Sequence, residues 1–173
     1  MVLEIRNKIP VPKRLTMNKL KGALLVLCVL LFVGCDSGRV YESDHDFDGL
    51  SWHMDSIPSF QFTIDDTTPK DVVFKIRNSL DFPFRNCYIT YMLEDSLGNT
   101  LKSELINMAL FDEKTGEPFG KGNSVFQHAQ TILSNYSFPD AGTYNLRLAQ
   151  YMRRTDLVGT YSIGVRVEEA RKK

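Results

Sequence analysis

Ser59-Phe-Gln-Phe-Thr-Ile64 alternates polar and apolar side chains over all six residues. Successive side chains of a β-strand point to opposite faces, so Phe60, Phe62 and Ile64 share one face and Gln61 and Thr63 share the other. This period of two predicts a strand that is buried on one side and exposed to water on the other. A strand of this kind is typical of an antiparallel sheet that covers a core.

The same alternation recurs along the following sequence. In Asp71-Val-Val-Phe-Lys-Ile-Arg77 the side chains of Val72, Phe74 and Ile76 are predicted to face inward, and those of Lys75 and Arg77 outward. Turn signals separate further strands predicted near residues 87–93, 100–106, 125–133, 143–152 and 160–167. About seven short strands without crossover helices predict an all-β fold, an antiparallel β-sandwich of immunoglobulin-like or jelly-roll-like kind.

A tyrosine near the end of the chain supports this architecture. The segment Asp140-Ala-Gly-Thr-Tyr144-Asn-Leu146 looks like the corner that precedes a central strand of immunoglobulin-like sandwiches. In such a corner the Tyr144 ring packs into the core and its hydroxyl bonds to nearby backbone. The pattern indicates a sandwich without fixing the order of its strands.

An apolar run precedes the predicted sandwich. Residues 23–33 span only about 16 Å as a helix, which is too short to cross a bilayer. Lys19 and Lys21 flank the run, and it ends at Gly34-Cys35, which resembles a bacterial lipobox. An uncleaved short membrane helix or ordinary secretory cleavage are the alternatives. We therefore expect a signal peptide at residues 1–34, with Met17 the suspected true start.

The resemblance to a lipobox makes Cys35 the first mature residue and the site of lipidation, with acyl chains that anchor the protein without spanning the membrane. Residues 35–58 are polar and rich in turn formers, so we expect a lipidated N-terminus and tether there. The β-sandwich domain is then expected at residues 59–170. Its length suffices for one domain with its own core.

Charge and cysteine content exclude two classes of protein. The predicted signal peptide holds six Lys and Arg and one Glu, which leaves 15 basic and 20 acidic residues in the mature part. A mildly acidic domain without a basic stripe gives no electrostatic reason to bind nucleic acid. Cys28 leaves with the signal and Cys35 carries lipid, so no internal disulfide is possible. Cys87 lies in an apolar run and is expected to be a small buried side chain.

One group of acidic residues has the spacing of a calcium loop. Asp44, Asp46 and Asp48 are followed by Gly49, and Asp55 stands eleven residues after Asp44. However, Asp55 is shorter than the bidentate glutamate preferred at the last position, and no helical pattern flanks the loop. Clustered acids in a solvated tether are the alternative, and we expect no metal site.

No motif for catalysis is present in the sequence. The three histidines share no ligand spacing, and the patterns of serine hydrolases and zinc hydrolases are missing. The glycine-rich segment 112–124 lacks the Gly-Lys-Ser/Thr of a phosphate-binding loop and is expected to be a flexible connection. Trp52 is a candidate contact for a ligand, as a platform for sugar rings. The alternative is a core tryptophan that closes one end of the sandwich.

Several short segments stand in a characteristic order after the lipobox. They are Cys35-Asp-Ser-Gly-Arg-Val-Tyr-Glu42, Trp52 with Asp55, Phe60-Gln-Phe62 with Asp66-Thr67, Asp81-Phe-Pro-Phe84, and Phe138-Pro-Asp-Ala-Gly-Thr-Tyr144 followed by Gln150-Tyr-Met-Arg153. In this order they resemble the GldH family of gliding-motility lipoproteins of Bacteroidota. The resemblance covers nearly all of the mature chain.

The resemblance implies a non-catalytic envelope lipoprotein that supports gliding and, through shared components, type 9 protein secretion. It implies no enzymatic activity and no cofactor beyond the covalent lipid on Cys35. Its partners would be the membrane, through the lipid, and other gliding or secretion components. Ser37-Gly38-Arg39 lacks the acidic cluster that tends to direct such lipoproteins to the cell surface, so we expect an outer-membrane protein that faces the periplasm.

Two other functions are carried forward as alternatives to this scaffold. The first is a glycan-binding lipoprotein module in which Trp52 and neighbouring aromatic residues stack on sugar rings. The second is an unrecognised hydrolase, because a glycosidase needs only two carboxylates placed in space.

Overall fold

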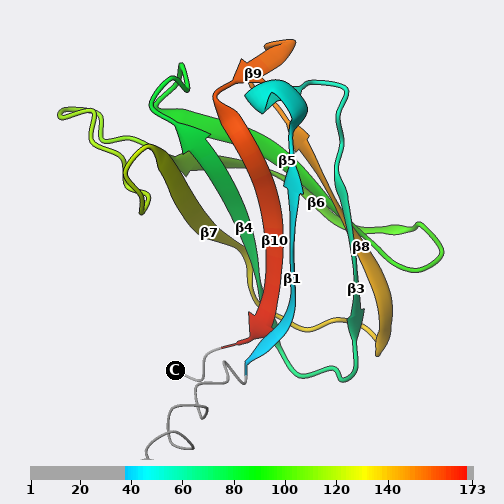
Figure 1. Ribbon diagram of the computed structural model, residues 1–173. Helices are drawn as coiled ribbons and strands as arrows, with labels where there is room; N and C mark the ends of the chain where they lie inside the picture. Colours follow the sequence, from blue (N-terminus) through cyan, green and yellow to red (C-terminus); the bar gives the residue numbers. More distant parts are fainter. Residues whose placement is uncertain (1–37, 171–173) are drawn as a thin grey trace, which may run out of the picture. The chain divides into compact units, whose positions relative to one another are not determined.

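The computed structural model describes residues 38–170, which form two four-stranded sheets packed face to face (Figure 1). The elements are β1 (Arg39–Asp46), the 3-10 turn η1 (Asp48–Leu50), β2 (Ser51–His53), β3 (Ser59–Ile64), β4 (Lys70–Ser79), β5 (Asn86–Glu94), β6 (Thr100–Ala109), β7 (Val125–Tyr136), β8 (Gly142–Gln150), β9 (Asp156–Val158) and β10 (Thr160–Glu169). One sheet has the order β1-β10-β4-β7 and the other β3-β8-β5-β6. Every pairing is antiparallel, which confirms the predicted sandwich.

The core lies between the two sheets and is built by alternation along each strand. In β4 the side chains of Val72, Phe74 and Ile76 are fully buried, as predicted. They lie opposite Val167, Val165 and Ile163 of β10 in register. The other sheet contributes a matching inner face, whose buried members are Phe60, Phe62, Ile64, Cys87, Ile89, Tyr91, Leu93, Met108, Tyr144, Leu146 and Leu148.

The tyrosine corner is present at the start of β8. The Tyr144 hydroxyl donates a hydrogen bond to the Asp140 carbonyl oxygen at 2.6 Å, and its ring packs 4.7 Å from that of Phe138 between centroids. β8 lies inside its sheet between β3 and β5. The predicted return of the hydroxyl to nearby backbone is therefore confirmed.

The predicted tether is wrong from Arg39 onward. Residues 39–46 form β1, which pairs with β10 from Arg39 opposite Glu168 to Asp46 opposite Ser162. β2 follows and pairs with β9 in a separate two-stranded ribbon at one end of the sandwich. The sequence of β1 does not alternate between polar and apolar residues, because β1 is an edge strand with polar side chains at most positions on both faces. The sandwich thus begins about twenty residues earlier than the predicted boundary at Ser59.

Candidate functional site

The chain enters and leaves the sandwich at the same end. The Gly38 carbonyl oxygen accepts a hydrogen bond of 2.7 Å from the Glu169 amide. Cys35, the predicted lipidation site, lies outside the described residues. Two residues separate it from Gly38, and covalent geometry limits the distance between the two Cα atoms to about 11 Å. An acyl group on Cys35 would therefore hold this end, the anchor end, close to the membrane surface.

A buried lysine organises the anchor end. Lys70 is 1% exposed, and its Nζ lies 2.7 Å from Asp66 Oδ1 and 3.1 Å from Glu169 Oε1. Burial acts to lower the pKa of Lys70, but the hydrogen bonds with the two carboxylates outweigh it and the pKa is raised. The same bond, together with Thr68, lowers the pKa of Asp66 to about 2. The loop after β3 is therefore tied to the last strand.

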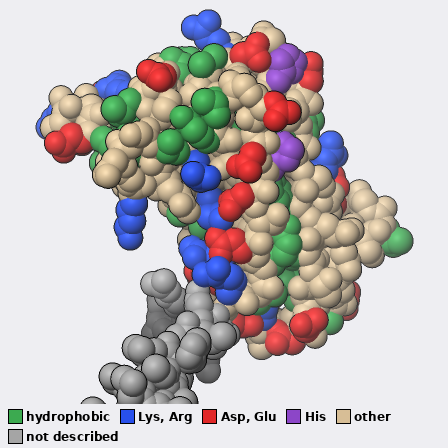
Figure 2. Space-filling view, in the orientation of Figure 1, with side chains coloured by type: hydrophobic (Ala, Val, Ile, Leu, Met, Phe, Trp, Pro, Cys, Tyr) green, Lys and Arg blue, Asp and Glu red, His purple; other side chains and the backbone are tan. Residues whose placement is uncertain are grey.

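A second buried lysine lies on the outer face of the β1-β10-β4-β7 sheet. Lys75 is 4% exposed, with Nζ 2.6 Å from Glu42 Oε1 and 2.9 Å from Asp44 Oδ1. The hydrogen bond from Lys75 holds the pKa of Glu42 below its usual range. The prediction that Lys75 points outward is right, but β1 supplies two carboxylates that cover it. Figure 2 shows basic and acidic side chains side by side on this face.

Glycine between these strands makes the ion pair possible. Gly164 of β10 is the direct neighbour of Asp44 on one side and of Lys75 on the other. A Cβ at Gly164 would lie 1.9 Å from Asp44 Oδ1 and 2.8 Å from the Ser43 carbonyl oxygen. Because Gly164 has no side chain, the Lys75 side chain can cross over β10 at this position and reach the carboxylates of β1.

The structure does not assemble the four aspartates into a calcium loop. Asp44 and Asp46 lie in β1, Asp48 lies in η1, and Asp55 stands in the turn after β2 beside His53. Asp44 is bound to Lys75. Within residues 38–170, no three His, Cys, Asp or Glu side chains come close enough to hold a metal ion. The spacing matches that of a loop, but the first two aspartates belong to a strand.

Trp52 is a core residue. Its side chain has no exposed surface, its ring stacks on that of Phe47 at 5.4 Å between centroids, and Nε1 donates to the Ser56 carbonyl oxygen at 2.8 Å. No face of the indole is available to a sugar ring. The structure thus contradicts the proposed ligand contact and agrees with the alternative, a tryptophan that closes one end of the core.

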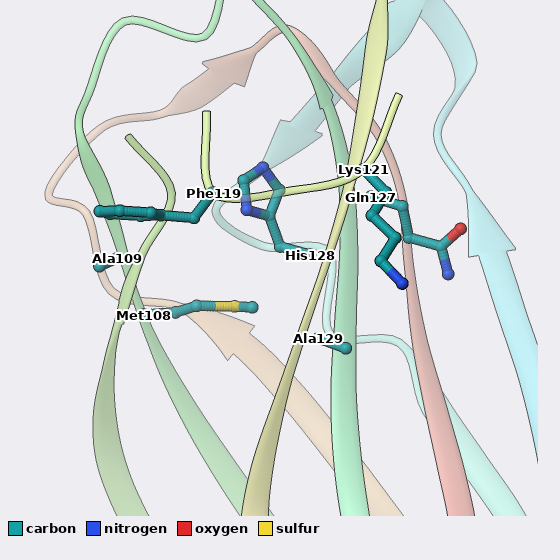
Figure 3. A pocket seen from close by; sticks show the side chains of 7 residues that line it. All are labelled: Met108, Ala109, Phe119, Lys121, Gln127, His128 and Ala129. Carbon is teal, nitrogen blue, oxygen red and sulfur yellow. The ribbon is translucent and has the colours of Figure 1, made fainter. Parts of the chain in front are cut away.

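A cavity of about 450 Å³ lies between the edges of the two sheets. β6 contributes Met108 and Ala109, β7 contributes Gln127, His128 and Ala129, and the glycine-rich loop contributes Phe119 and Lys121 (Figure 3). The loop segment 118–121, the strap, crosses this opening. The Phe119 amide donates to the Leu110 carbonyl oxygen, and Lys121 and Gln127 exchange two backbone hydrogen bonds. The predicted flexible connection therefore contains an ordered bridge between the sheets.

The strap covers a buried histidine. His128 is 4% exposed, its Nε2 has no hydrogen-bond partner, and burial lowers its pKa. A Cβ at Gly120 would lie 2.7 Å from Nε2, so only glycine lets the strap approach the imidazole so closely. The cavity presents an aromatic ring, an ammonium group, an amide and this imidazole. No sequence motif marks it, because its members come from three separate segments.

The thiol of Cys87, the cysteine within the described residues, is unreactive. Cys87 is fully buried, and burial raises the pKa of its thiol to about 12. A thiol with such a pKa stays protonated at neutral pH and is a poor nucleophile. The expected role as a small buried side chain is confirmed.

The end of the sandwich away from Gly38 carries exposed apolar side chains. Leu50, Leu80 and Val158, the distal patch, surround Gly159, whose amide donates to the Leu50 carbonyl oxygen. The Gly159 carbonyl oxygen in turn accepts from the Ser79 amide. β10 separates this patch from the anchor end, and ten residues of strand span about 33 Å. Figure 2 shows hydrophobic side chains gathered toward this end.

No helix within residues 38–170 is long and apolar enough to cross a membrane. The predicted signal peptide lies outside this part of the chain.

A protein-family model and two curated relatives indicate the same family for this chain. A protein-family model described as GldH lipoprotein matches residues 39–167. A curated relative from Christiangramia forsetii, named gliding motility lipoprotein GldH homolog, is 28% identical over 160 residues, covering 85% of this chain and 94% of its own. A relative from Flavobacterium johnsoniae, named gliding motility lipoprotein GldH, is 26% identical over 163 residues, with coverage of 87% and 97%.

Solved structures match less closely. The infectious bursal disease virus VP2 subviral particle aligns with a TM-score of 0.39 and 14% identity, over 78% of this chain and 33% of that one. A second structure of the virus, from the Gt strain, gives a TM-score of 0.37 and 16% identity over similar shares. This chain spans about a third of the length of those proteins.

Proposed function

Because this chain belongs to the GldH lipoprotein family, we propose that it is a membrane-anchored envelope lipoprotein that supports gliding motility. The family match covers residues 39–167, which is almost all of the described sandwich. Both curated relatives carry gliding motility in their names and align over nearly their whole length. This agreement over the full sandwich is the observation that carries the proposal.

The anchor in this proposal is lipid on Cys35. Two or more acyl chains bind a membrane almost permanently, whereas one chain alone binds reversibly. Because β1 begins at Arg39, the sandwich follows the lipid after only three residues. The protein therefore acts at the membrane surface, with no long flexible tether between the lipid and the folded domain.

Its role is that of a non-catalytic scaffold, in gliding and in the associated type 9 secretion. The distal patch supports this role, since exposed apolar side chains grouped at one end mark surfaces that bind other proteins. The patch stands one strand length from the anchor end, where a membrane-bound partner could be reached. We place the protein in the outer membrane facing the periplasm, in line with the absence of acidic residues in Ser37-Gly38-Arg39.

The proposal is tested in the source bacterium by replacing the gene with a deletion or with Cys35→Ala. We expect loss of colony spreading, and loss of type 9 substrates from the medium, for both. The matched control is Ser37→Ala, which keeps the cysteine and should behave like the unaltered strain. Normal spreading and secretion of the deletion strain would refute the proposal. A defect confined to growth on one polysaccharide would favour a glycan-binding module.

Partners are identified by crosslinked purification of the tagged lipoprotein from its own envelope. Recovery of gliding or type 9 secretion proteins is expected, and it should fall when Val158 is changed to Lys. Leu97→Lys is the matched control, because Leu97 is also an exposed apolar side chain but lies in the β5–β6 turn. Equal recovery with both variants would remove the distal patch from the proposed interface.

A further inference from the structure

The edge strand β6 is unusually accessible for its length. It ends the β3-β8-β5-β6 sheet, and within the described residues no strand pairs with its second edge. Nearly all of its side chains are exposed, on both faces. A long edge strand with free backbone groups is a template for pairing with another strand.

The other three edges are less suited to pairing. β3 has only six residues. β1 has eight residues and one irregularity of register, and two of its carboxylates are bound to Lys75. The β4–β7 ladder contains two irregularities, and the strap pairs with β7 at Gln127. Short length and bulges are devices that discourage edge pairing. β6 has ten residues and one irregularity, opposite Leu93 and Glu94 at its beginning.

The two faces of β6 follow from its register with β5. Lys102, Glu104, Ile106 and Met108 lie opposite the buried residues of β5 and share the core-facing side. Lys102 and Glu104 are nevertheless exposed, and their charged groups lie 3.8 Å apart. Ser103 and Leu105 share the outer side, where Leu105 is an exposed apolar residue. Leu101 is the extra residue of the irregularity, because Leu93 pairs with Lys102 and Glu94 with Thr100.

This sequence is complementary to itself in one antiparallel register. When two copies of β6 pair around a two-fold axis at Ser103, Lys102 of each copy stands opposite Glu104 of the other. Moving the axis by one residue in either direction places Lys102 opposite Lys102, or Glu104 opposite Glu104. Opposite charges across two strands stabilise the pair and like charges destabilise it.

We propose that two copies of this chain associate through β6, with the axis at Ser103, and join their sheets into one continuous sheet of eight strands. The charge pattern selects a second copy over an unrelated strand, because only a copy offers the same residues in reverse order. Such an interface is isologous and closes on itself. The axis is perpendicular to the joined sheet, so the second copy runs in the opposite direction and the two anchor ends point opposite ways along the strands. Both lipids reach one membrane when the joined sheet lies along its surface.

The first test places cysteine on the axis in the full lipidated chain, in its own envelope. Ser103→Cys would bring two thiols opposite each other, within the range that a disulfide bridges. Mild oxidation should then give a disulfide-linked dimer on a non-reducing gel. Thr63→Cys on β3, the other edge of the same sheet, should stay monomeric. No dimer with Ser103→Cys, or equal amounts with both variants, would overturn the proposal.

The second test exchanges the charges in the Ser103→Cys background. Lys102→Glu and Glu104→Lys each place two like-charged pairs across the axis and should lower the dimer yield at least about fivefold. The double variant restores opposite charges and should restore the yield. Lys114→Glu, the same charge change on an exposed loop residue, should leave it unaltered. A double variant whose dimer yield is as low as that of the single variants would contradict the proposed register.

Discussion

Gly164 illustrates how one missing side chain determines the surroundings of a charge. Lys75 is almost fully buried on the outer face of its sheet, and its two carboxylate partners come from a strand that is not its neighbour. The intervening strand would block this contact if it carried a Cβ at position 164. The ion pair therefore depends on a residue that takes no part in it.

We expect Gly164→Ala to lower the free energy of unfolding by about 1–3 kcal/mol, the range for overpacking a filled site. The new methyl group would push Asp44 away from Lys75 and press on the Ser43 carbonyl oxygen. Urea denaturation of the detergent-solubilised lipoprotein measures the change. In the Asp44→Ala background the same substitution should cost less, because one of the two clashes is gone. Equal costs in both backgrounds would show that Asp44 is not displaced.

His128 predicts a dependence of stability on pH. Burial lowers its pKa in the folded protein below the ordinary value of 6.5, so the unfolded chain binds a proton first as the pH falls. Stability should therefore be unaffected by His128 above pH 6.5 and should decrease below it, until the folded pKa is passed. A single titrating group changes the free energy of unfolding by at most about 1.4 kcal/mol per pH unit.

The measurement compares urea denaturation between pH 7.5 and 5.5 for the unaltered protein and His128→Gln. The variant should lose less stability over this range. His53→Gln, which removes an imidazole from a side chain that is about half exposed, is the matched control for the change of residue type. A variant that follows the unaltered protein at every pH would exclude His128 as the cause.

At the scale of elements, the strap joins two sheets that are otherwise open on that side. It is held to β6 through Leu110 and to β7 through Gln127. Gly120→Val should detach it, because a Cβ there meets both the His128 ring and the Gln127 carbonyl oxygen. Hydrogen exchange of the Lys121 and Gln127 amides should accelerate, while the β4–β10 ladder stays protected. Glu117→Ala, at an exposed position in the same loop, should not accelerate it.

The success of prediction from sequence also differs between elements. β3 is predicted with its observed ends, and β4, β5, β6, β7, β8 and β10 are found with small shifts. Burial alternates clearly in β3, β5 and β8. β6, whose side chains are nearly all exposed, is marked instead by the turn signal that precedes it. Side-chain alternation does not mark β1, because this strand covers little of the core and its carboxylates bind Lys75. β2 and β9 have three residues each, too few for a period to appear. The cavity and the self-complementary edge depend on register, which side-chain periodicity does not reveal.

At the scale of the whole molecule, the proposed lipid on Cys35 would be joined to the sandwich by a short connection, which would limit how far the distal patch can stand from the lipid. Inserting ten Gly and Ser residues between Ser37 and Gly38 would add about 17 Å of flexible reach. We expect this insertion to abolish spreading while lipidation and abundance stay normal. Inserting the same ten residues between Leu97 and Gly98, in an exposed turn, should preserve spreading. Normal spreading with both insertions would mean that the distance between the lipid and the distal patch is not important.

The pairing of β1 with β10 has a mechanical consequence. If the lipid is held by the membrane and a partner pulls on the distal end, tension enters β1 at Arg39 and runs along its length. The hydrogen bonds to β10 are perpendicular to that direction, so they are sheared together and do not open one after another. The six in-register pairs from Tyr41 to Asp46 would share the force. The first strand after the anchor is thus oriented to resist traction.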